Sequence, residues 1–190
     1  MIIEIIAVAT GLLSVWFSKK INILVYPIGI ISVLLYVFLF IKNSLYANAV
    51  INLIYGLISI FGWWNWSRQQ DKETTRQQED GKLAVTFLSV KGRIITSLLL
   101  IISFFVIGIG FDTDLSTKLD YATSFLGLGA IILTAYKKVD NWILYLIADI
   151  VLIPLCIYNG LYLTSFQYLV YTILAIMGLI SWSKEAKKNV

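Results

Sequence analysis

The chain has 190 residues, of which 59% are hydrophobic and only 14% are charged, and its net charge is +4. Soluble domains are about 45–50% apolar and about 25% charged, so this composition excludes a cytosolic enzyme and a disordered protein. The chain has no His and a single Cys, Cys156, which removes the commonest general base and excludes both a disulfide framework and a Cys-based zinc site. We therefore expect a membrane protein with no catalytic residue, no metal and no cofactor.

Seven apolar stretches are long enough, or nearly so, to cross the hydrocarbon core of a bilayer, which takes about 20 helical residues. The breaks between most of them are only a few residues long, so neighbouring helices should run antiparallel. The one long break, 67–93, is largely polar and is expected to be a loop. The sequence therefore predicts an all-α membrane protein with seven transmembrane helices, at residues 2–18, 21–41, 46–66, 94–110, 115–136, 142–158 and 161–182.

The basic residues are distributed unequally between the two sides that seven spans would create. One side carries only Lys42 and Lys118, whereas the other carries the remaining 13 of the 15 Lys and Arg residues. Loops rich in Lys and Arg stay in the cytoplasm. We therefore expect the N-terminus outside and the C-terminus in the cytoplasm, and the positive charge needs no nucleic-acid partner.

A shift of 116 residues aligns the chain with part of itself. Tyr55 falls on Tyr171, Gly62 on Gly178, and Trp66 on Trp182. The shift pairs the first three helices with the last three, and the unpaired fourth helix lets both groups run in the same direction. The expected plan is thus 3+1+3, two parallel repeats of the kind found in some transporters. Its parts are a first repeat at 1–66, a cytoplasmic loop at 67–93, a linking helix at 94–114, a second repeat at 115–182 and a cytoplasmic tail at 183–190.

The third helix carries polar and aromatic residues at alternating steps of four and three, which places them on one face. Inside a membrane such a face must meet protein or water. The matching face of the seventh helix is also polar, so the two faces should line a central cavity. Their Gly residues are expected to allow close helix packing, and Trp66 is either a cytoplasmic gate or part of an aromatic belt. These two faces are Asn48, Asn52, Tyr55, Ser59, Gly62 and Trp66, and Thr164, Tyr168, Tyr171, Ala175, Gly178 and Trp182, with Gln167 beside the second.

The sixth helix has an acid near its middle, Asp149, with Trp142 and Tyr145 on the same face. A carboxylate at this depth is costly unless a partner relieves it. Two aromatic rings beside a carboxylate suit a flat cation, so a substrate-binding role is one interpretation. The other is a hydrogen bond from a Tyr hydroxyl that holds two helices together. Glu4 and Asp120 lie nearer their helix N-termini, where the helix dipole favours a solvated acid.

Several of these motifs resemble the PnuC family of bacterial vitamin transporters. They are Tyr26-Pro27 with Gly29, Leu45-Tyr46-Ala47, Gly62-Trp63-Trp64-Asn65-Trp66, Asn141-Trp142 and Gly160-Leu161-Tyr162. The resemblance implies a fold similar to the SWEET transporters, with two three-helix bundles joined by one helix. It also implies facilitated diffusion of a vitamin across the inner membrane, with trapping by a cytoplasmic kinase. Many members have Gln in place of Asn52 and Asn in place of Asp149.

The resemblance and the acid together make nicotinamide riboside the expected substrate and thiamine the alternative, because both carry a positive charge on a flat ring. A membrane-embedded enzyme and a seven-helix receptor are the competing classes. The chain lacks a metal motif for the first and a Lys inside the seventh helix for the second, and a homo-oligomer is left open. The expected substrate-binding residues are Asn48, Asn52, Tyr55, Trp66, Trp142, Tyr145, Asp149, Gln167, Tyr168 and Tyr171.

Overall fold

The computed structural model describes residues 2–44, 46–75, 85–110 and 114–188, and within these ranges the chain is all-α apart from one isolated β-bridge. The prediction of an all-α protein is confirmed. The helices in chain order are α1 (Ile2–Lys19), α2 (Val25–Lys42), α3 (Tyr46–Thr75), α4 (Val90–Gly110), α5 (Leu115–Ala135), α6 (Asn141–Tyr158) and α7 (Tyr162–Lys188).

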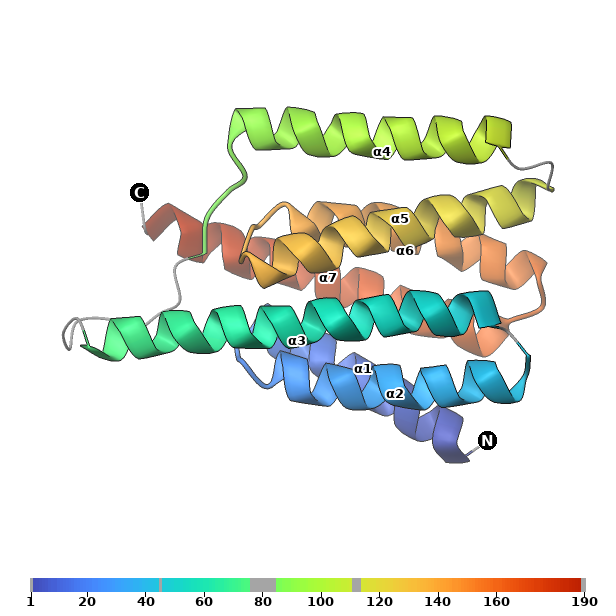
Figure 1. Ribbon diagram of the computed structural model, residues 1–190, viewed down its shortest axis with the longest axis horizontal. Coiled ribbons are helices and arrows are strands. Elements are labelled where there is room, and N and C mark those ends of the chain that lie inside the picture. The colour runs from blue at the N-terminus through green and yellow to red at the C-terminus, as the bar shows by residue number, and fades with distance from the viewer. Residues whose placement is uncertain (1, 45, 76–84, 111–113, 189–190) are drawn as a thin grey trace.

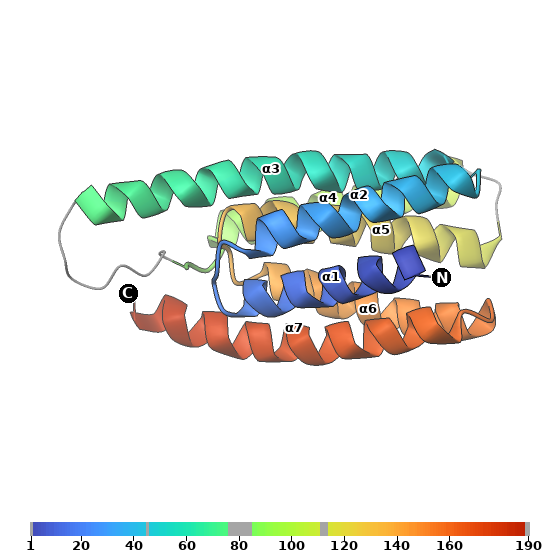
Figure 2. The ribbon, with the colours of Figure 1, turned by 90° about the horizontal axis from the view of Figure 1, so that it is seen from below.

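Six of these helices form a closed ring, and α4 lies outside it (Figure 1). Around the ring, α1 packs on α2, α2 on α3, α3 on α5, α5 on α6, α6 on α7, and α7 on α1. The helix α4 packs on α5 alone among the described helices. Helices α3 and α7 lie on opposite sides of the bundle (Figure 2) and, among the described residues, do not pack directly against each other along their lengths.

The outer surface of the ring is apolar, as a lipid-facing surface must be. Large side chains such as Leu57 and Leu163 are more than half exposed in the isolated chain. Five of the described helices are both long and apolar enough to cross a membrane, namely α1, α2, α3, α6 and α7. Since lipid is as apolar as these side chains, their exposure is the expected state of a multi-pass membrane protein.

The two chain ends lie at opposite ends of the bundle (Figure 1). We call the end that carries the α1–α2 turn, the α5–α6 turn and the end of α7 the basic end. Of the 13 basic residues expected on one side, Arg76 and Lys82 lie outside the described residues. The other 11 lie toward the basic end, whereas Lys42 and Lys118 lie toward the opposite end.

Four helix boundaries differ clearly from the hydropathy pattern: α2 begins later and α4 begins earlier than predicted, and both α3 and α7 end later. Helix α2 begins at Val25 rather than at residue 21, because Ile21 adopts a left-handed backbone with φ of 55° and the Asn22 side chain accepts a hydrogen bond from the Leu24 amide. Helix α3 continues beyond Trp66 to Thr75. The run after Trp66 is rich in Arg, Gln, Lys and Glu, which are good helix formers in water, so the helix outlasts its apolar part.

Residues 116 apart adopt the same local backbone. The left-handed φ of Ile21 recurs at Lys137 (54°), and that of Ser44 (59°) recurs at Gly160 (73°). The side-chain amide of Asn43 donates to the carbonyl of Leu39, four residues back in α2, and Asn159 does the same to the carbonyl of Leu155 in α6. Helices α1 to α3 and α5 to α7 therefore share a geometry as well as a sequence pattern, and we call them the first and second halves.

Candidate functional site

The interior of the ring contains a cluster of tyrosines around Asp149. Tyr145 lies one turn before Asp149 on α6, and Tyr168 and Tyr171 reach it from α7. The hydroxyls of all three interact electrostatically with the Asp149 carboxylate. The predicted group was Asp149 with Trp142 and Tyr145. Tyr145 lies beside Asp149 in this cluster, and Trp142 packs against Tyr145 with ring centroids 6.1 Å apart.

The Asp149 carboxylate lies in this interior without a neutralising partner. The residue is 6% exposed, and within the described ranges no side chain or backbone group forms a hydrogen bond or an ion pair with it. The described residues contain no hydrogen bond from a Tyr hydroxyl to Asp149, and the choice between the substrate-binding and the helix-packing interpretation stays a prediction. A buried carboxylate without a partner is a strong acceptor for a cationic or hydrogen-bonding ligand.

The equivalent tyrosines of the two halves contact equivalent positions on the opposite half. The Tyr55 hydroxyl donates to the Ser124 carbonyl of α5 at 3.1 Å and lies against Gly127. The Tyr171 hydroxyl accepts from the Gln167 amide at 3.0 Å. It approaches Gly11 so closely that a Cβ there would lie 2.7 Å away. Each tyrosine thus crosses the interface between the halves at a glycine.

The amides of α3 lie apart from this cluster. The Asn52 side chain donates to the backbone carbonyl of Asn48 at 3.0 Å, and both residues are half-buried. The structure therefore ties Asn52 to its own helix through one N–H, and its side-chain oxygen and second N–H remain as hydrogen-bonding groups. The assignment of Asn48 and Asn52 to the substrate path stays a prediction.

The basic end of the ring is closed by aromatic side chains. Trp66 and Trp182 are completely buried, with ring centroids 6.1 Å apart, and the Trp142 ring packs edge-on against Trp182 at 5.5 Å. Trp63 and Trp64 are exposed, as residues of a membrane aromatic belt are. The burial of Trp66 fits the gate interpretation and not the belt.

Two of the three indole N–H groups of this closure, those of Trp66 and Trp182, are satisfied by the opposite halves. Trp66 donates to the carbonyl of Thr134 on α5 at 3.2 Å, and Trp182 donates to the carbonyl of Ser18 on α1 at 2.9 Å. Thr134 and Ser18 are themselves 116 residues apart. Each half therefore caps the last turn of the other half's first helix.

Gly62 and Gly178 lie under aromatic rings, in agreement with the packing interpretation. A Cβ on Gly62 would lie 2.5 Å from the Tyr26 ring, and one on Gly178 would lie 2.5 Å from the Trp142 ring. Tyr26 and Trp142 are again 116 residues apart. The absence of a side chain at these positions is what lets each ring lie flat against the neighbouring helix.

The acids at the end opposite the basic end have different roles. Asp114 caps α5, where its carboxylate accepts hydrogen bonds from the hydroxyl and the amide of Thr117 at 2.6 and 3.2 Å. These bonds hold the pKa of the Asp114 carboxyl below its ordinary value. Asp120 lies more than one turn further along and interacts electrostatically with Tyr55 and Tyr168. Asp114 therefore caps the N-terminus of α5, whereas Asp120 is exposed, as expected of a solvated acid in the first half of that helix.

Two interior tyrosines were not among the expected site residues. Tyr26 is 2% exposed and packs edge-on against Trp66 at 5.1 Å, and Tyr36 of α2 interacts with Gln167. The repeat contains a signal for Tyr26, since the 116-residue shift places it on Trp142. No spacing pattern in the sequence identifies Tyr36.

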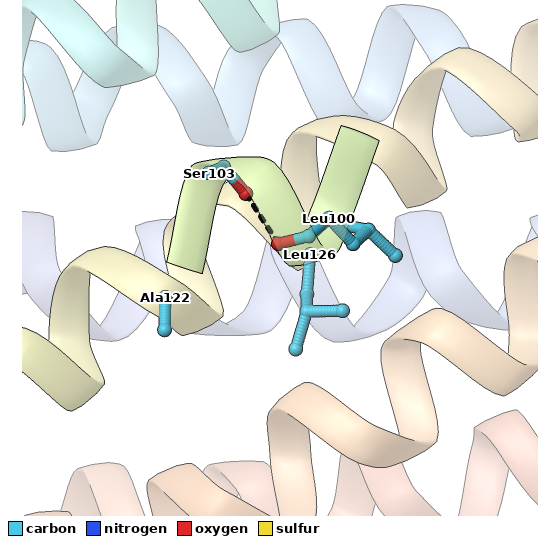
Figure 3. A pocket seen from close by; sticks show the side chains of 4 residues that line it. All are labelled: Leu100, Ser103, Ala122 and Leu126. Atoms are coloured by element: carbon cyan, nitrogen blue, oxygen red, sulfur yellow. Dashed lines mark hydrogen bonds between the residues drawn. The ribbon is translucent and has the colours of Figure 1, made fainter. Parts of the chain in front are cut away.

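A small cavity lies away from this cluster, between α4 and α5 (Figure 3). Its volume is about 120 Å³, and its walls are Leu100, Ser103, Ala122 and Leu126. The only polar side chain among these, Ser103, donates to the Leu100 carbonyl of its own helix at 2.8 Å. None of the expected substrate-binding residues lines it, and its chemistry suits an apolar chain rather than a vitamin.

The interior has the chemistry of a recognition site for a small polar molecule. It offers one unpaired carboxylate, several phenol hydroxyls, an amide and stacked aromatic rings. Within the described part of the chain no group of three or more His, Cys, Asp or Glu side chains could hold a metal ion. Such a set of residues is suited to bind a small polar molecule.

Comparisons with known proteins agree on one family. The model of the nicotinamide mononucleotide transporter family matches residues 1–184. The chain is 24% identical over 212 residues to the nicotinamide riboside transporter PnuC of Escherichia coli (strain K12), covering 98% of this chain and 87% of the relative. It is 26% identical over 201 residues to PnuC of Neisseria mucosa, covering 97% and 73%.

A more distant relative and a solved structure complete the comparison. The riboflavin/roseoflavin transporter RibM of Streptomyces davaonensis is 24% identical over 136 residues, which are 70% of this chain and 62% of RibM. A crystal structure of the vitamin B3 transporter PnuC superposes with a TM-score of 0.76 at 22% identity, over 99% of this chain and 83% of that one. The structural likeness establishes the fold.

Proposed function

The chain belongs to the nicotinamide mononucleotide transporter family, and on that premise we propose that it takes up a cationic B-vitamin, nicotinamide riboside first of all, across the bacterial inner membrane. Membership of a transporter family sets aside the membrane-embedded enzyme. The observation that supports a cationic substrate is the buried, unpartnered carboxylate of Asp149 among Tyr145, Tyr168 and Tyr171.

The binding mode follows from the residues around the acid. The positively charged pyridinium ring of nicotinamide riboside would lie against Tyr145 and Trp142, whose ring centroids are 6.1 Å apart, with its charge toward Asp149. Such a cation over an aromatic face gains about 0.5–2 kcal/mol. The ribose would form hydrogen bonds with the hydroxyls of Tyr168 and Tyr171 and with the amide of Gln167. The α3 side of the path would be lined by Asn48, Asn52 and Tyr55. Trp66 would close it at the basic end.

The transport cycle would move the two halves against each other. The ring order and the contacts shared by residues 116 apart support a 3+1+3 plan with two parallel repeats. The 11 basic residues described toward one end support a cytoplasmic basic end and an outward N-terminus. Transport would be facilitated diffusion, with net uptake maintained by a cytoplasmic kinase that phosphorylates the vitamin.

Thiamine is the second candidate on the same observation, because it also carries a fixed positive charge on a flat ring. Riboflavin is neutral, so it would gain no charge attraction from the Asp149 carboxylate and is the less favoured substrate.

Binding to purified protein tests the proposal. Titration of nicotinamide riboside, thiamine and riboflavin, followed by quenching of tryptophan fluorescence, should show saturable binding of one of the cations and weak or no binding of riboflavin. Uptake of the same radiolabelled vitamin into proteoliposomes should follow. Tight riboflavin binding without cation binding would overturn the assignment.

A further inference from the structure

The described segment that leads into α4 crosses the basic end and is fastened to the α5–α6 turn. The amide of Thr86 donates to the carbonyl of Lys137 at 3.2 Å, and the amide of Val139 donates to the carbonyl of Thr86 at 3.0 Å. Together they form a single parallel β-bridge between Thr86 and Lys138. The Lys138 ammonium also donates to the Thr86 hydroxyl at 2.7 Å. We call residues 85–93 the strap.

Asp140 fastens the strap at a second point. One carboxylate oxygen accepts from the Leu88 amide at 2.7 Å, and the other forms an ion pair with the Arg93 guanidinium at 2.7 Å. Asp140 is only 8% exposed, whereas the Arg93 side chain is half exposed, so the bond to the Leu88 amide is the better shielded of these two charge-assisted bonds. Both oxygens of one carboxylate thus hold two points of the strap.

The first residue of the strap belongs to the aromatic closure. Val85 is completely buried in one core cluster with Tyr26, Trp66, Trp142 and Trp182. The closure therefore includes a residue from outside the ring. A movement that separated these rings would also disturb the packing of Val85.

The closed arrangement leaves buried polar atoms unsatisfied. Among the described residues, the hydroxyl of Tyr26, the indole N–H of Trp142 and the side-chain oxygen of Asn141 have no hydrogen-bond partner. Unpaired buried groups are uncommon in folded proteins and favour any state in which water or a ligand reaches them. The fastening of the strap opposes that tendency.

We propose that the strap is a latch, which holds the basic end closed and detaches from the α5–α6 turn each time that end opens. The proposal goes beyond the transport function, because it assigns a moving part to a segment that lies outside both halves. It also gives Asp140 a role in the cycle although it lies at the basic end, away from the Asp149 site.

A reversible cross-link tests whether the latch must move. Thr86→Cys and Lys138→Cys are introduced together in a Cys156→Ser background, which removes the single native thiol. Oxidation should form a disulfide between the strap and the turn. Uptake of nicotinamide riboside should then fall to less than about a tenth of the reduced protein's rate, because a cross-linked strap cannot alternate between its closed and open positions. Reduction should restore uptake, and the single-cysteine proteins should not respond. Unchanged uptake by fully cross-linked protein would overturn the proposal.

A second measurement does not depend on transport. Val85→Cys, in the same Cys156→Ser background, is labelled with a membrane-impermeant maleimide applied from the basic end. Adding Asp140→Ala removes the bonds to Leu88 and Arg93, so the strap should detach more often and expose the introduced thiol to the reagent. Labelling should therefore become about tenfold faster or more. Lys91→Ala is the matched control, because Lys91 is exposed on the same strap, and it should leave the rate unchanged. Equal rates with and without Asp140→Ala would overturn the latch, whatever the substrate proves to be.

Discussion

Replacing Asp149 by Asn removes one negative charge from the tyrosine cluster and changes little else. The carboxylate is 6% exposed and has no partner in the described chain, so a bound cation would be its main electrostatic counterpart. Two unit charges about 5 Å apart interact by about 3 kcal/mol at an effective dielectric constant of about 20. Charge-assisted bonds contribute about 1.5–3 kcal/mol net, which corresponds to a factor of roughly 10 to 150 in affinity.

The assay compares a cation with its neutral counterpart. Nicotinamide riboside and its ring-reduced form have nearly the same shape but differ in charge, so the ratio of their dissociation constants isolates the contribution of Asp149. The ratio should favour the cation in the parent protein and fall by about 10-fold or more in Asp149→Asn. Thermal unfolding in detergent should show a variant as stable as the parent, because a buried unpaired carboxylate is costly to the fold. An unchanged ratio would refute the reasoning, and an equal loss for both ligands with a lower Tm would make Asp149 a packing residue.

Four further outcomes are expected. Alkaline phosphatase fused after Val190 should be inactive in cells, since that enzyme needs export and the C-terminus is expected in the cytoplasm. Asn52→Leu should weaken vitamin binding by about 1–3 kcal/mol if its free oxygen bonds the ligand, and unchanged affinity in a well-folded variant would place the site elsewhere. Gly178→Ala should destabilise the protein by about 1–3 kcal/mol through overlap with Trp142, measured as a lower Tm. Because the pKa of Asp114 is lower in the folded protein than in the unfolded chain, Asp114 stabilises the fold at pH values above the ordinary carboxyl pKa. This stabilisation is lost as the pH falls through the pKa of the folded protein. In Asp114→Asn that part of the decrease in Tm at acidic pH should be absent.

The helices could be predicted because a membrane leaves the chain few choices. Every backbone polar group in lipid must be satisfied within its own segment, so a long apolar run must be helical. This constraint does not apply to residues in water, where backbone polar groups can bond to solvent. Hydropathy could not show that α3 continues through its polar residues to Thr75, or that Ile21 takes a left-handed backbone at the start of a predicted span.

The site was predictable only in part, for a related reason. Spacing along one helix shows which residues share a face, and it correctly grouped Tyr145 with Asp149 and Tyr168 with Tyr171. It cannot show which faces meet. The contact of Tyr36 with Gln167 and the fastening of Thr86 to Lys138 join segments far apart in the sequence, and a single sequence contains no signal for either pair.

The exchanged indole bonds have a consequence for how the chain is built. During synthesis the N–H of Trp66 has no acceptor until Thr134 on α5 has been made. The carbonyl of Ser18 on α1 likewise has no donor until Trp182 near the end of α7 has been made. A three-helix half made alone would therefore hold one orphan donor and one orphan acceptor, and two identical halves could satisfy each other by the same exchange. The single chain thus contains the kind of exchanged contacts that two identical subunits would make, and the C-terminal turn of α1 gains its last hydrogen bond only after α7 has been synthesised.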